Sequence, residues 1–449
     1  MSFCGFLLIK AIEGMNLMGI YKSGYLIPMT SGGQAKILDE LGEGGQGTVY
    51  KVEYKGKAYA LKWYKKDALR KPDQFYSNLK NNIANPPSSK AFLWPLYLSE
   101  KHDGSFGYLM DLRPKQYKDF ADFLLAKVHF SGADAALNAA LNIVEGFLDL
   151  HARGYSYQDL NDGNFFINPV NGDVLICDND NVSENGENQG IAGKMRYMAP
   201  EIVRREANPD LMSDRFSLAI ILFMILCLDH PLDGKMTCVP CMTEELEKKC
   251  YGLDPVFIFD KNDRRNAAVP GVNTNALMCW PDLPKYIQDA FGEVFSHDAM
   301  TNKDRAGRLS ERQWQKLLLR AKAELVKCTC GSEQFMYATE SSIICSNPKC
   351  KKRIEHSGVL HAKYDVILQV DKKLYPYQFN DAMTDYKNPC GLVVSNPKDP
   401  RIKGITNCSE EIWTVTAPDG KKQEYPKGRS LLIKAGNTIS LFGGKAEIY

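Results

Sequence analysis

The alternation of apolar and polar residues changes character along the chain. From Ile37, the sequence AKILDELGEGGQGTVYKVEYKGKAYALKWY contains two alternating apolar runs joined by a glycine-rich bend, and a third run after a Lys-Gly turn. Residues 73–83 are predicted to form a short helix with Asp73 as its N-cap. The segment FLWPLYLSEKHDGSFGYLMDL predicts a hairpin that turns at Asp103-Gly104.

After Leu112 the apolar spacing becomes helical, in DFADFLLAKV and DAALNAALNIVEGFLDLHARG. The apolar run FSLAIILFMILCL (residues 216–228) is well short of the roughly 20 residues that a bilayer requires, so we expect a buried helix and no membrane span. Strand patterns return from about residue 357, separated by Pro-Asp-Gly and Ala-Gly-Asn turns. The pattern predicts a small sheet lobe, then a helical lobe, then a C-terminal β-domain.

Composition narrows the class of protein. The 449 residues are 44% hydrophobic and 24% charged, and this length suggests about two to four domains. A formal net charge of +2 gives no reason to expect binding to nucleic acid or to an anionic membrane. The 13 cysteines are mostly scattered, which favours a reduced, cytoplasmic interior over a disulfide framework. Residues 1–30 lack a basic leader and a small-residue cleavage site, and we interpret them as an N-terminal extension.

The glycine-rich bend LGEGGQGTV has Gly42, Gly44 and Gly47 in a GxGxxG spacing. A dinucleotide-binding turn has the same spacing but must open a helix, whereas the residues after Gly47 continue as a strand. This context excludes a dinucleotide oxidoreductase and favours a hairpin lid over phosphates. Without a Cβ, the backbone N–H groups can approach phosphate oxygens closely. Taken alone, the bend is also compatible with an ordinary hairpin turn.

Four further residues have types that suit phosphate and magnesium chemistry. In AYALKWY, Lys62 can reach nucleotide phosphates, and Ala60 on the same strand face leaves room for adenine. In YQDLNDGNFFIN, Asp159 is followed five residues later by Asn164, and Asp178 follows a short predicted hairpin. This is the carboxylate and amide spacing that holds a substrate hydroxyl and magnesium ions in phosphoryl transfer.

Over residues 31–325, the chain resembles eukaryotic-type Ser/Thr protein kinases. The resemblance implies a bilobal α+β kinase fold and the transfer of the γ-phosphoryl group of ATP to protein hydroxyls with Mg²⁺. It rests on eight elements in the order of the family: Gly42/Gly44/Gly47, Lys62, Asp159, Asn164, Asp178, MAPE (198–201), DRFSLA (214–219) and Arg308.

The same resemblance implies a role for each matched residue. Asp159 would accept the proton of the substrate hydroxyl, and Asn164 and Asp178 would hold magnesium. Glu201 would pair with Arg308, and Asp214 would anchor the backbone of the catalytic loop. The implied nucleotide-binding residues are Gly42, Gly44, Gly47, Val49, Ala60, Lys62, Met110 as gatekeeper, Asp111 and Leu112 at the hinge, and Phe166 as the floor under adenine.

Within this family, the segments LGEGGQGTVYKV, YQDLNDGNFFIN and ICDNDN resemble a bacterial group. Kinases of that group accompany a TerY-like von Willebrand A-type protein and a metal-dependent Ser/Thr phosphatase. The resemblance therefore implies these two proteins as partners, in addition to protein substrates.

The chain departs from the family pattern beside both aspartates. Tyr157-Gln158 stands where the family has His-Arg, and Asn179-Asp180 stands where it has Phe-Gly. The missing Arg is the cation that binds an activation-loop phosphate. The loop over residues 179–199 also has a single Ser or Thr hydroxyl, Ser183. We therefore expect activity without phosphorylation of this loop.

The predicted helix at 73–83 lacks the Glu that pairs with the strand Lys in active kinases. Asp73 stands too early in this helix to replace it. We expect Asn78, Asn81 or Asn82 to hydrogen-bond Lys62 instead, which is weaker than an ion pair. This departure supports the alternative hypothesis of a nucleotide-binding pseudokinase scaffold.

At two positions expected to face each other across the substrate site, this chain lacks the usual lysine on one side and has a lysine on the other. Ser/Thr kinases carry a Lys two residues after the catalytic Asp, where this chain has Asn161. They also carry a Gly-Thr pair at the end of the activation segment, where this chain has Gly193-Lys194. Our hypothesis is that Lys194 acts in catalysis in place of the missing Lys. The alternative is a solvated loop charge.

Residues 326–356 are interpreted as a zinc ribbon. They contain a C-x-C pair and a C-x4-C pair, which suit tetrahedral thiolate coordination. Four protein ligands leave no position for water, so the expected zinc is structural. His356 is an alternative to one of the ligands, which are Cys328, Cys330, Cys345 and Cys350.

Two other features allow only weaker predictions. The pair Cys238 and Cys241 forms C-x-x-C with no second pair close by, which favours loop cysteines over a metal site. Residues 357–449 predict a small β-sandwich whose ending faintly resembles forkhead-associated domains. The alternative is a docking module of unspecified partner.

Overall fold

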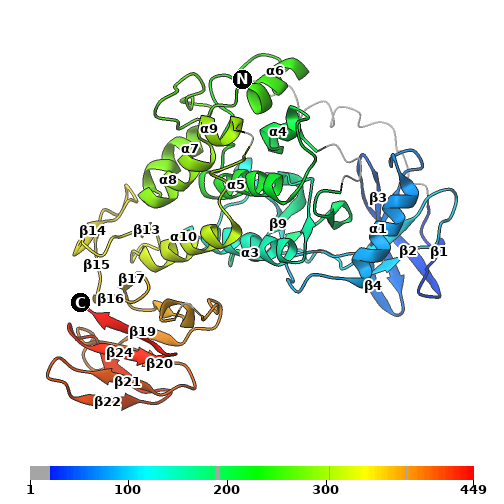
Figure 1. Ribbon diagram of the computed structural model, residues 1–449. Coiled ribbons are helices and arrows are strands. Elements are labelled where there is room, and N and C mark those ends of the chain that lie inside the picture. The colour runs from blue at the N-terminus through cyan, green and yellow to red at the C-terminus, as the bar shows by residue number, and fades with distance from the viewer. Residues whose placement is uncertain (1–20, 188–192, 303, 381) are drawn as a thin grey trace. The chain divides into compact units, whose positions relative to one another are not determined.

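The structure is a computed structural model that describes residues 21–187, 193–302, 304–380 and 382–449 (Figure 1). The chain divides into two compact units. Unit 1 comprises the residues up to Ser131 together with Ala135–Gln315, and unit 2 comprises Gly132–Asp134 and Lys316–Tyr449. Within the described residues, no helix has both the length and the apolar character that crossing a bilayer would require.

Unit 1 begins with an antiparallel six-stranded sheet in the order β1-β2-β3-β4-β6-β5. The three predicted runs and the predicted hairpin all lie in it, and the hairpin turns at Asp103-Gly104, where both residues have positive φ. The strands are β1 (Leu26–Pro28), β2 (Gln34–Glu43), β3 (Gly47–Tyr54), β4 (Lys57–Tyr64), β5 (Tyr97–Leu98) and β6 (Gly107–Met110).

Strand β1 changes the interpretation of the N-terminal extension. Residues 21–30 were assigned to that extension, but β1 pairs with β2, and Ile27 and Met29 are buried in the sheet core with Tyr21. The sheet lobe therefore starts before residue 31. Residues 1–20 lie outside the described part of the chain.

Strand β4 is buried on both faces because its alternating residues enter two different cores. Leu61 and Trp63 belong to the core on one face of the sheet. Ala60 and Tyr64 belong to the core on the other face, which also contains Phe75 and Leu79 of helix α1 (Pro72–Ala84). Lys62 has the same register as Ala60 and Tyr64, so its side chain lies on the α1 face.

The rest of unit 1 is mainly helical, as the 3.6-residue spacing predicts. Its longest helices are α3 (Ala133–Ala152) and α5 (Leu211–Cys227), and α5 is buried almost all round, as expected for the apolar run at 216–228. The other helices are α2 (Phe120–Leu124), α4 (Pro200–Val203), α6 (Glu244–Lys248), α7 (Thr274–Cys279), α8 (Lys285–Val294) and α9 (His297–Thr301). Helix α10 (Glu311–Glu324) begins in unit 1 and continues into unit 2 from Lys316.

Short elements at the start of the helical lobe carry the candidate site. Their antiparallel pairing holds the loops between them in place: β9 pairs with β10 and β7, and β11 pairs with β8. They are β7 (Lys118–Asp119), β8 (Tyr155–Ser156), β9 (Phe165–Ile167), β10 (Val174–Ile176), β11 (Ser183–Glu184) and the 3₁₀ turns η1 (Asp162–Asn164), η2 (Asn179–Asn181) and η3 (Met195–Tyr197).

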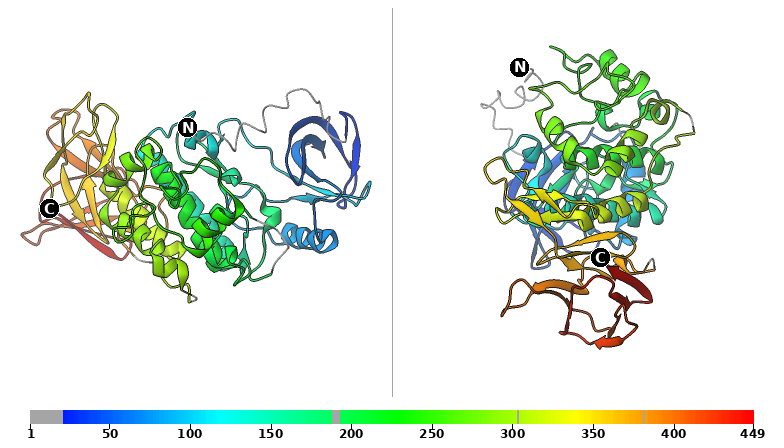
Figure 2. Two further views of the ribbon diagram at one scale, coloured as in Figure 1. Left: turned by 90° about the horizontal axis from the view of Figure 1, so that it is seen from above. Right: turned by 90° about the vertical axis from the view of Figure 1, so that its left-hand side faces the viewer.

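Unit 2 contains two hairpins and two larger sheets (Figure 2). The hairpins are β12 (Leu325–Lys327) with β13 (Glu333–Phe335), and β14 (Ser342–Ile344) with β15 (Arg353–Glu355). The larger sheets share one core that surrounds the buried Trp413. Their orders are β17-β16-β25-β24-β21-β22 and β18-β19-β20-β23, within residues 358–448.

The strands of the larger sheets are β16 (Gly358–His361), β17 (Asp365–Leu368), β18 (Lys373–Leu374), β19 (Gly391–Ser395), β20 (Lys403–Asn407), β21 (Trp413–Thr416), β22 (Lys422–Tyr425), β23 (Ser430–Leu432), β24 (Thr438–Leu441) and β25 (Gly444–Ile448).

Candidate functional site

The glycine-rich turn between β2 and β3 is held closed by its own backbone. The Gly44 N–H donates to the Gly47 carbonyl at 2.8 Å, and Lys65 Nζ lies 3.1 Å from the Gly44 carbonyl. A Cβ at Gly47 would lie 2.2 Å from the Trp63 carbonyl oxygen, so only glycine fits at this strand pairing. Gly42 lies in the exposed end of β2. The turn can therefore form the predicted lid.

The residues expected to surround adenine come together in a single cluster. Ala60 is paired with Met110 across β4 and β6, and both are buried. The guanidinium carbon of Arg113 lies 4.0 Å from the centre of the Phe166 ring. The partly buried members of the cluster include Val49, Leu112, Phe166 and Leu175. Asp111 is exposed and pairs with Lys57 at 2.8 Å.

Lys62 forms ion pairs with two carboxylates. Its Nζ lies 2.9 Å from Asp178 Oδ1 and 2.7 Å from Asp180 Oδ2. Burial lowers the pKa of Lys62, but the charges of Asp180 and Asp178 outweigh burial and raise it overall. The lysine therefore stays protonated, as a phosphate ligand must.

The prediction that asparagines of helix α1 hydrogen-bond Lys62 is wrong. Asn78 Nδ2 and Asn82 Nδ2 both donate to the Val182 carbonyl, at 2.7 and 2.9 Å. Asn81 instead accepts a hydrogen bond from Asn85 at the end of the helix. The two donors lie one helical turn apart on the same face of α1, and that face contacts backbone rather than the lysine.

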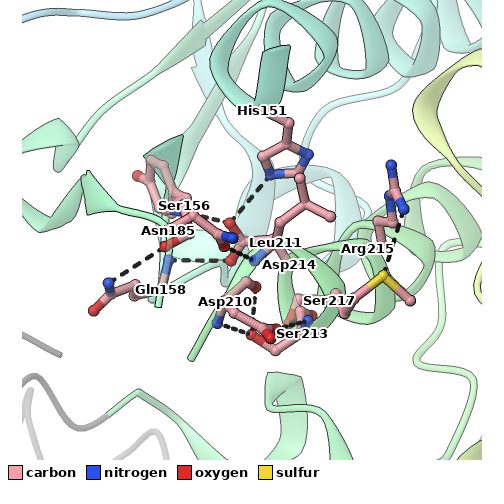
Figure 3. Close-up of polar contacts among 12 residues, drawn as sticks. His151, Ser156, Gln158, Asn185, Asp210, Leu211, Ser213, Asp214, Arg215 and Ser217 are labelled. Atoms are coloured by element: carbon pink, nitrogen blue, oxygen red, sulfur yellow. Dashed lines mark hydrogen bonds and ion pairs between the residues drawn. The ribbon is translucent and has the colours of Figure 1, made fainter. Parts of the chain in front are cut away.

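Asp214 at the start of α5 fixes the backbone that leads into the catalytic loop, as expected. It accepts hydrogen bonds from the Tyr157 N–H at 2.6 Å and the Gln158 N–H at 3.1 Å. His151 Nε2 lies 3.2 Å from the same carboxylate (Figure 3). Burial lowers the pKa of His151, but hydrogen bonds to Asp214 and Glu311 outweigh it and raise this pKa to about 9. His151 was not predicted from the sequence, because no spacing rule identifies it.

Tyr157 connects the two residues expected to hold magnesium. Its hydroxyl donates to the Cys177 carbonyl, next to Asp178, and accepts a hydrogen bond from Asn164 Nδ2 at 2.9 Å. Because the Asn164 nitrogen is used in this way, its carbonyl oxygen is the atom that remains for a cation. A carboxylate and an amide oxygen fit the oxygen ligands that Mg²⁺ prefers.

Asp159 lies between groups of opposite charge. Burial and the charge of Asp178 raise its pKa to about 6, while Lys194 and a hydrogen bond from Asn161 act to lower it. Lys194 Nζ is 2.9 Å from Asn161 Oδ1 and 3.4 Å from Asp162 Oδ1. Lys194 and Asn161 therefore face each other beside Asp159.

Ser183 is buried and forms hydrogen bonds within its own loop. Its Oγ accepts a hydrogen bond from Gln158 Nε2 and donates to the Glu187 carbonyl at 3.2 Å. Strand β11, which contains Ser183, pairs with β8. Neutral hydrogen bonds to Gln158 thus hold the segment that an Arg and a phosphate hold in the Ser/Thr kinases that the sequence resembles.

We therefore expect Ser183→Ala to keep kcat within about twofold of the unaltered chain, because no phosphate is needed at this position. The lost hydrogen bonds should cost about 1 kcal/mol of stability. The measurement is steady-state turnover, with mass spectrometry of the unaltered chain to confirm that Ser183 carries no phosphate. A large fall in kcat would contradict the prediction.

The expected brace of the helical lobe is formed. Arg308 Nη1 and Nη2 each lie 2.6 Å from one carboxylate oxygen of Glu201. Both side chains are buried, and the parallel two-bond geometry is the strong form of an Arg–carboxylate pair. It ties helix α4 to the segment just before α10.

The four cysteines of the predicted zinc ribbon come together in unit 2. Their sulfur atoms all lie within 4.8 Å of one another. The Cys328–Cys350 sulfurs are 3.7 Å apart and the Cys330–Cys345 sulfurs 3.6 Å apart. A tetrahedron with Zn–S bonds of about 2.3 Å has edges of about 3.8 Å, so the spacing fits zinc.

The two alternatives for metal binding do not fit. His356 Nε2 lies 3.2 Å from the Glu340 carbonyl, and its Nδ1 accepts a hydrogen bond from the Gly358 N–H, so both ring nitrogens are engaged. Within the described part of the chain, Cys238 and Cys241 are exposed and join no cluster of metal-ligating side chains.

We expect about one zinc atom per chain by elemental analysis of the purified protein. Cys345→Ser should lose this zinc, because three thiolates and a hydroxyl bind zinc far more weakly than four thiolates. Cys241→Ser is the matched control and should keep it. A chain without zinc, or zinc lost only in the control, would refute the site.

Part of the chain matches the sequence model of a known protein family. Residues 35–262 match the model described as protein kinase domain. Putative ribosomal protein S6 kinase alpha-1 of Caenorhabditis elegans is 25% identical over 211 residues, covering 45% of this chain and 26% of that protein. Ribosomal protein S6 kinase alpha-6 of Homo sapiens is 26% identical over 214 residues, covering 45% and 28%.

The chain thus spans about a quarter of the length of these curated relatives. Among solved structures, the PknI kinase domain of Mycobacterium tuberculosis is similar, with a TM-score of 0.42 and 17% identity. That match covers 67% of this chain and 98% of the other.

Proposed function

The chain belongs to the protein kinase family, and we propose that it is an active serine/threonine kinase that transfers the γ-phosphoryl group of ATP to protein hydroxyls with Mg²⁺. One observation carries the proposal. Lys62, Asp159, Asn164 and Asp178 lie at one site, and the side chain of each has its own hydrogen bonds or ion pairs. These are the residue types that position and neutralise a transferring phosphate.

Each residue would act through the atoms described above. When bound, magnesium supplies positive charge that neutralises the phosphates. Asp178 and the Asn164 carbonyl oxygen would hold it, and the Lys62 ammonium would bind the nucleotide phosphates. Asp159 would accept the hydroxyl proton, and its pKa near 6 leaves it mostly deprotonated at pH 7.

A cavity of about 750 Å³ supports a polypeptide as the acceptor. Its lining includes Asp162, three residues after Asp159, and the acidic side chains of Asp229 and Asp233. It also includes apolar side chains from α2 and α5, such as Leu124 and Met224. Contacts there would bind residues on either side of the reacting hydroxyl, and such remote contacts help to position the reacting groups.

The second candidate is a nucleotide-binding pseudokinase scaffold, which the missing helix Glu favours. The ion pairs of Lys62 argue against it, because the lysine has carboxylate partners even without that Glu. Incubation of the full chain with radiolabelled ATP, Mg²⁺ and a mixed protein substrate separates the two hypotheses. We expect label on serine or threonine that requires Mg²⁺ and is absent with Asp159→Asn. Nucleotide binding without any transfer would instead support the scaffold.

The partner proteins are also a proposal, supported by the resemblance of three segments alone. We propose that the chain binds a TerY-like von Willebrand A-type protein and is opposed by a metal-dependent Ser/Thr phosphatase. The first test is co-purification of the chain with a TerY-like von Willebrand A-type protein, and the second is removal of phosphate from the chain by a metal-dependent Ser/Thr phosphatase.

A further inference from the structure

The two carboxylates beside Lys62 differ in exposure. The side chain of Asp180 is 0% exposed and lies 2.7 Å from Lys62 Nζ. The side chain of Asp178 is 42% exposed and lies 2.9 Å from the same atom. Asp178 is therefore open to a metal and a nucleotide, whereas Asp180 is closed off from solvent and has no access to either.

Two phenols fix the buried carboxylate. Tyr108 Oη donates to Asp180 Oδ1 at 3.2 Å, and Tyr64 Oη donates to Oδ2. Tyr64 is two residues after Lys62 on β4, and Tyr108 is the direct partner of Lys62 on β6. All three side chains therefore lie on one face of the sheet. The sheet thus provides the ammonium of Lys62 and two phenol donors. The Asp180 carboxylate pairs with the ammonium and accepts the hydrogen bonds of both phenols.

The segment that contains Asp180 is itself held in place. In η2, Asn179 Nδ2 donates to two backbone carbonyls, at 2.9 and 2.8 Å. From α1, Asn78 and Asn82 donate to the Val182 carbonyl just after this turn. Asp73, the acidic residue of α1, lies in its first turn and is 88% exposed. Helix α1 thus holds the backbone of the segment, and the buried ion pair of Lys62 is formed by Asp180.

We propose that Asp180 is the positioning residue for Lys62, in place of the helix glutamate that other kinases use. Asp178 can then turn to a bound metal while Lys62 keeps a buried anion behind it and stays directed at the phosphates. Asp180, which positions Lys62, and Asp178, the candidate metal ligand, are two residues apart on one segment. Fixing the backbone of this segment therefore positions both carboxylates. The role in turnover rests on the function proposed above, whereas the role in nucleotide binding does not.

The first test compares two acid-to-amide exchanges in the full-length chain. Asp180→Asn removes the proposed anchor, and Asp73→Asn is the matched control on α1. We expect Asp180→Asn to weaken Mg·ATP binding about tenfold and to lower kcat about 10- to 100-fold, because a displaced lysine no longer meets the phosphates. Asp73→Asn should bind and turn over as the unaltered chain does. Binding is measured by titration calorimetry below the melting temperature of each variant.

The second test asks whether Asp180 acts through Lys62. In a Lys62→Met background, Asp180→Asn should change the Mg·ATP affinity by less than about twofold, because the group it positions has gone. A purely structural role would give the same loss in both backgrounds. That result would overturn the proposal, as would unchanged affinity in the single Asp180→Asn variant.

Tyr108→Phe serves as a milder variant if Asp180→Asn does not fold. It keeps the ion pair, and it should weaken Mg·ATP binding about threefold in the unaltered chain and not in Lys62→Met. Tyr59→Phe, on the opposite face of β4, is its control, and equal losses in the two phenylalanine variants would refute the assignment. Absence of phosphoryl transfer in every variant, with this binding pattern kept, would refute only the kinase function.

Discussion

Asp178→Ala is expected to lower kcat by about 10³-fold or more. Of the two carboxylates that pair with Lys62, that of Asp178 is the more exposed, and it would be a principal ligand for magnesium. Charge neutralisation by a bound metal is worth several kcal/mol in the transition state, and each 1.36 kcal/mol corresponds to tenfold in rate. The measurement is phosphate transfer from labelled ATP at saturating substrate, with Mg²⁺ varied.

This substitution is a cleaner test than Lys62→Ala. Without Asp178, Lys62 keeps its 2.7 Å pair with Asp180, so no buried charge is left alone. Without Lys62, the buried Asp180 would lose its cation, and such a loss destabilises by about 3–5 kcal/mol. Asp173→Ala, in the exposed turn between β9 and β10, is the control and should be fully active. Equal turnover of Asp178→Ala and the unaltered chain would exclude this carboxylate from catalysis.

Lys194→Ala is expected to lower kcat by about 10²–10³-fold while leaving ATP affinity nearly unchanged. Lys194 Nζ lies 2.9 Å from Asn161 Oδ1, the side chain at the position of the missing lysine, and we expect its charge to act in that lysine's place. A preorganised group that stabilises developing charge is typically worth this much in rate. Asn161→Lys in the Lys194→Ala background should recover part of kcat, because it returns a cation to the facing position.

The same variant should change the pH dependence. The charge of Lys194 lowers the pKa of Asp159, against burial and Asp178, which raise it to about 6. Removing Lys194 should raise this pKa further. Because the base acts only when deprotonated, the acidic limb of kcat/KM should move to higher pH. Unchanged kcat together with an unmoved acidic limb would identify Lys194 as a solvated loop charge.

Much of the site could be predicted because its residues stand at fixed intervals on predictable elements. Gly42, Gly47, Lys62 and Ala60 lie on strands whose alternation is evident in the sequence, and Ala60 packs in one cluster with Met110 and Phe166. Asp159, Asn164 and Asp178 lie on loops whose flanking strands are short but strongly apolar. In each case a local pattern determines the position of the side chain.

The partner of Lys62 could not be predicted in this way. Asp180 lies 118 residues from Lys62 in the sequence, and its role depends on Tyr64 and Tyr108 of a different lobe. The family places the partner of this lysine on the helix after the strand, and the asparagines of that helix were therefore the predicted partners. Asn78 and Asn82 instead donate to the Val182 carbonyl, a preference that spacing alone does not reveal.

The run Asp178–Asp180 constrains how the chain can diverge. Because this short turn contains both the metal-ligand candidate and the buried anion, a one-residue insertion or deletion within it displaces the two carboxylates at once. Helix α1 is under a different constraint, since Asn78 and Asn82 hold the segment through a backbone carbonyl and not through a side chain. The surface charges of α1 can therefore vary among related chains, and a search that requires an acidic residue at the usual position on this helix would miss such chains.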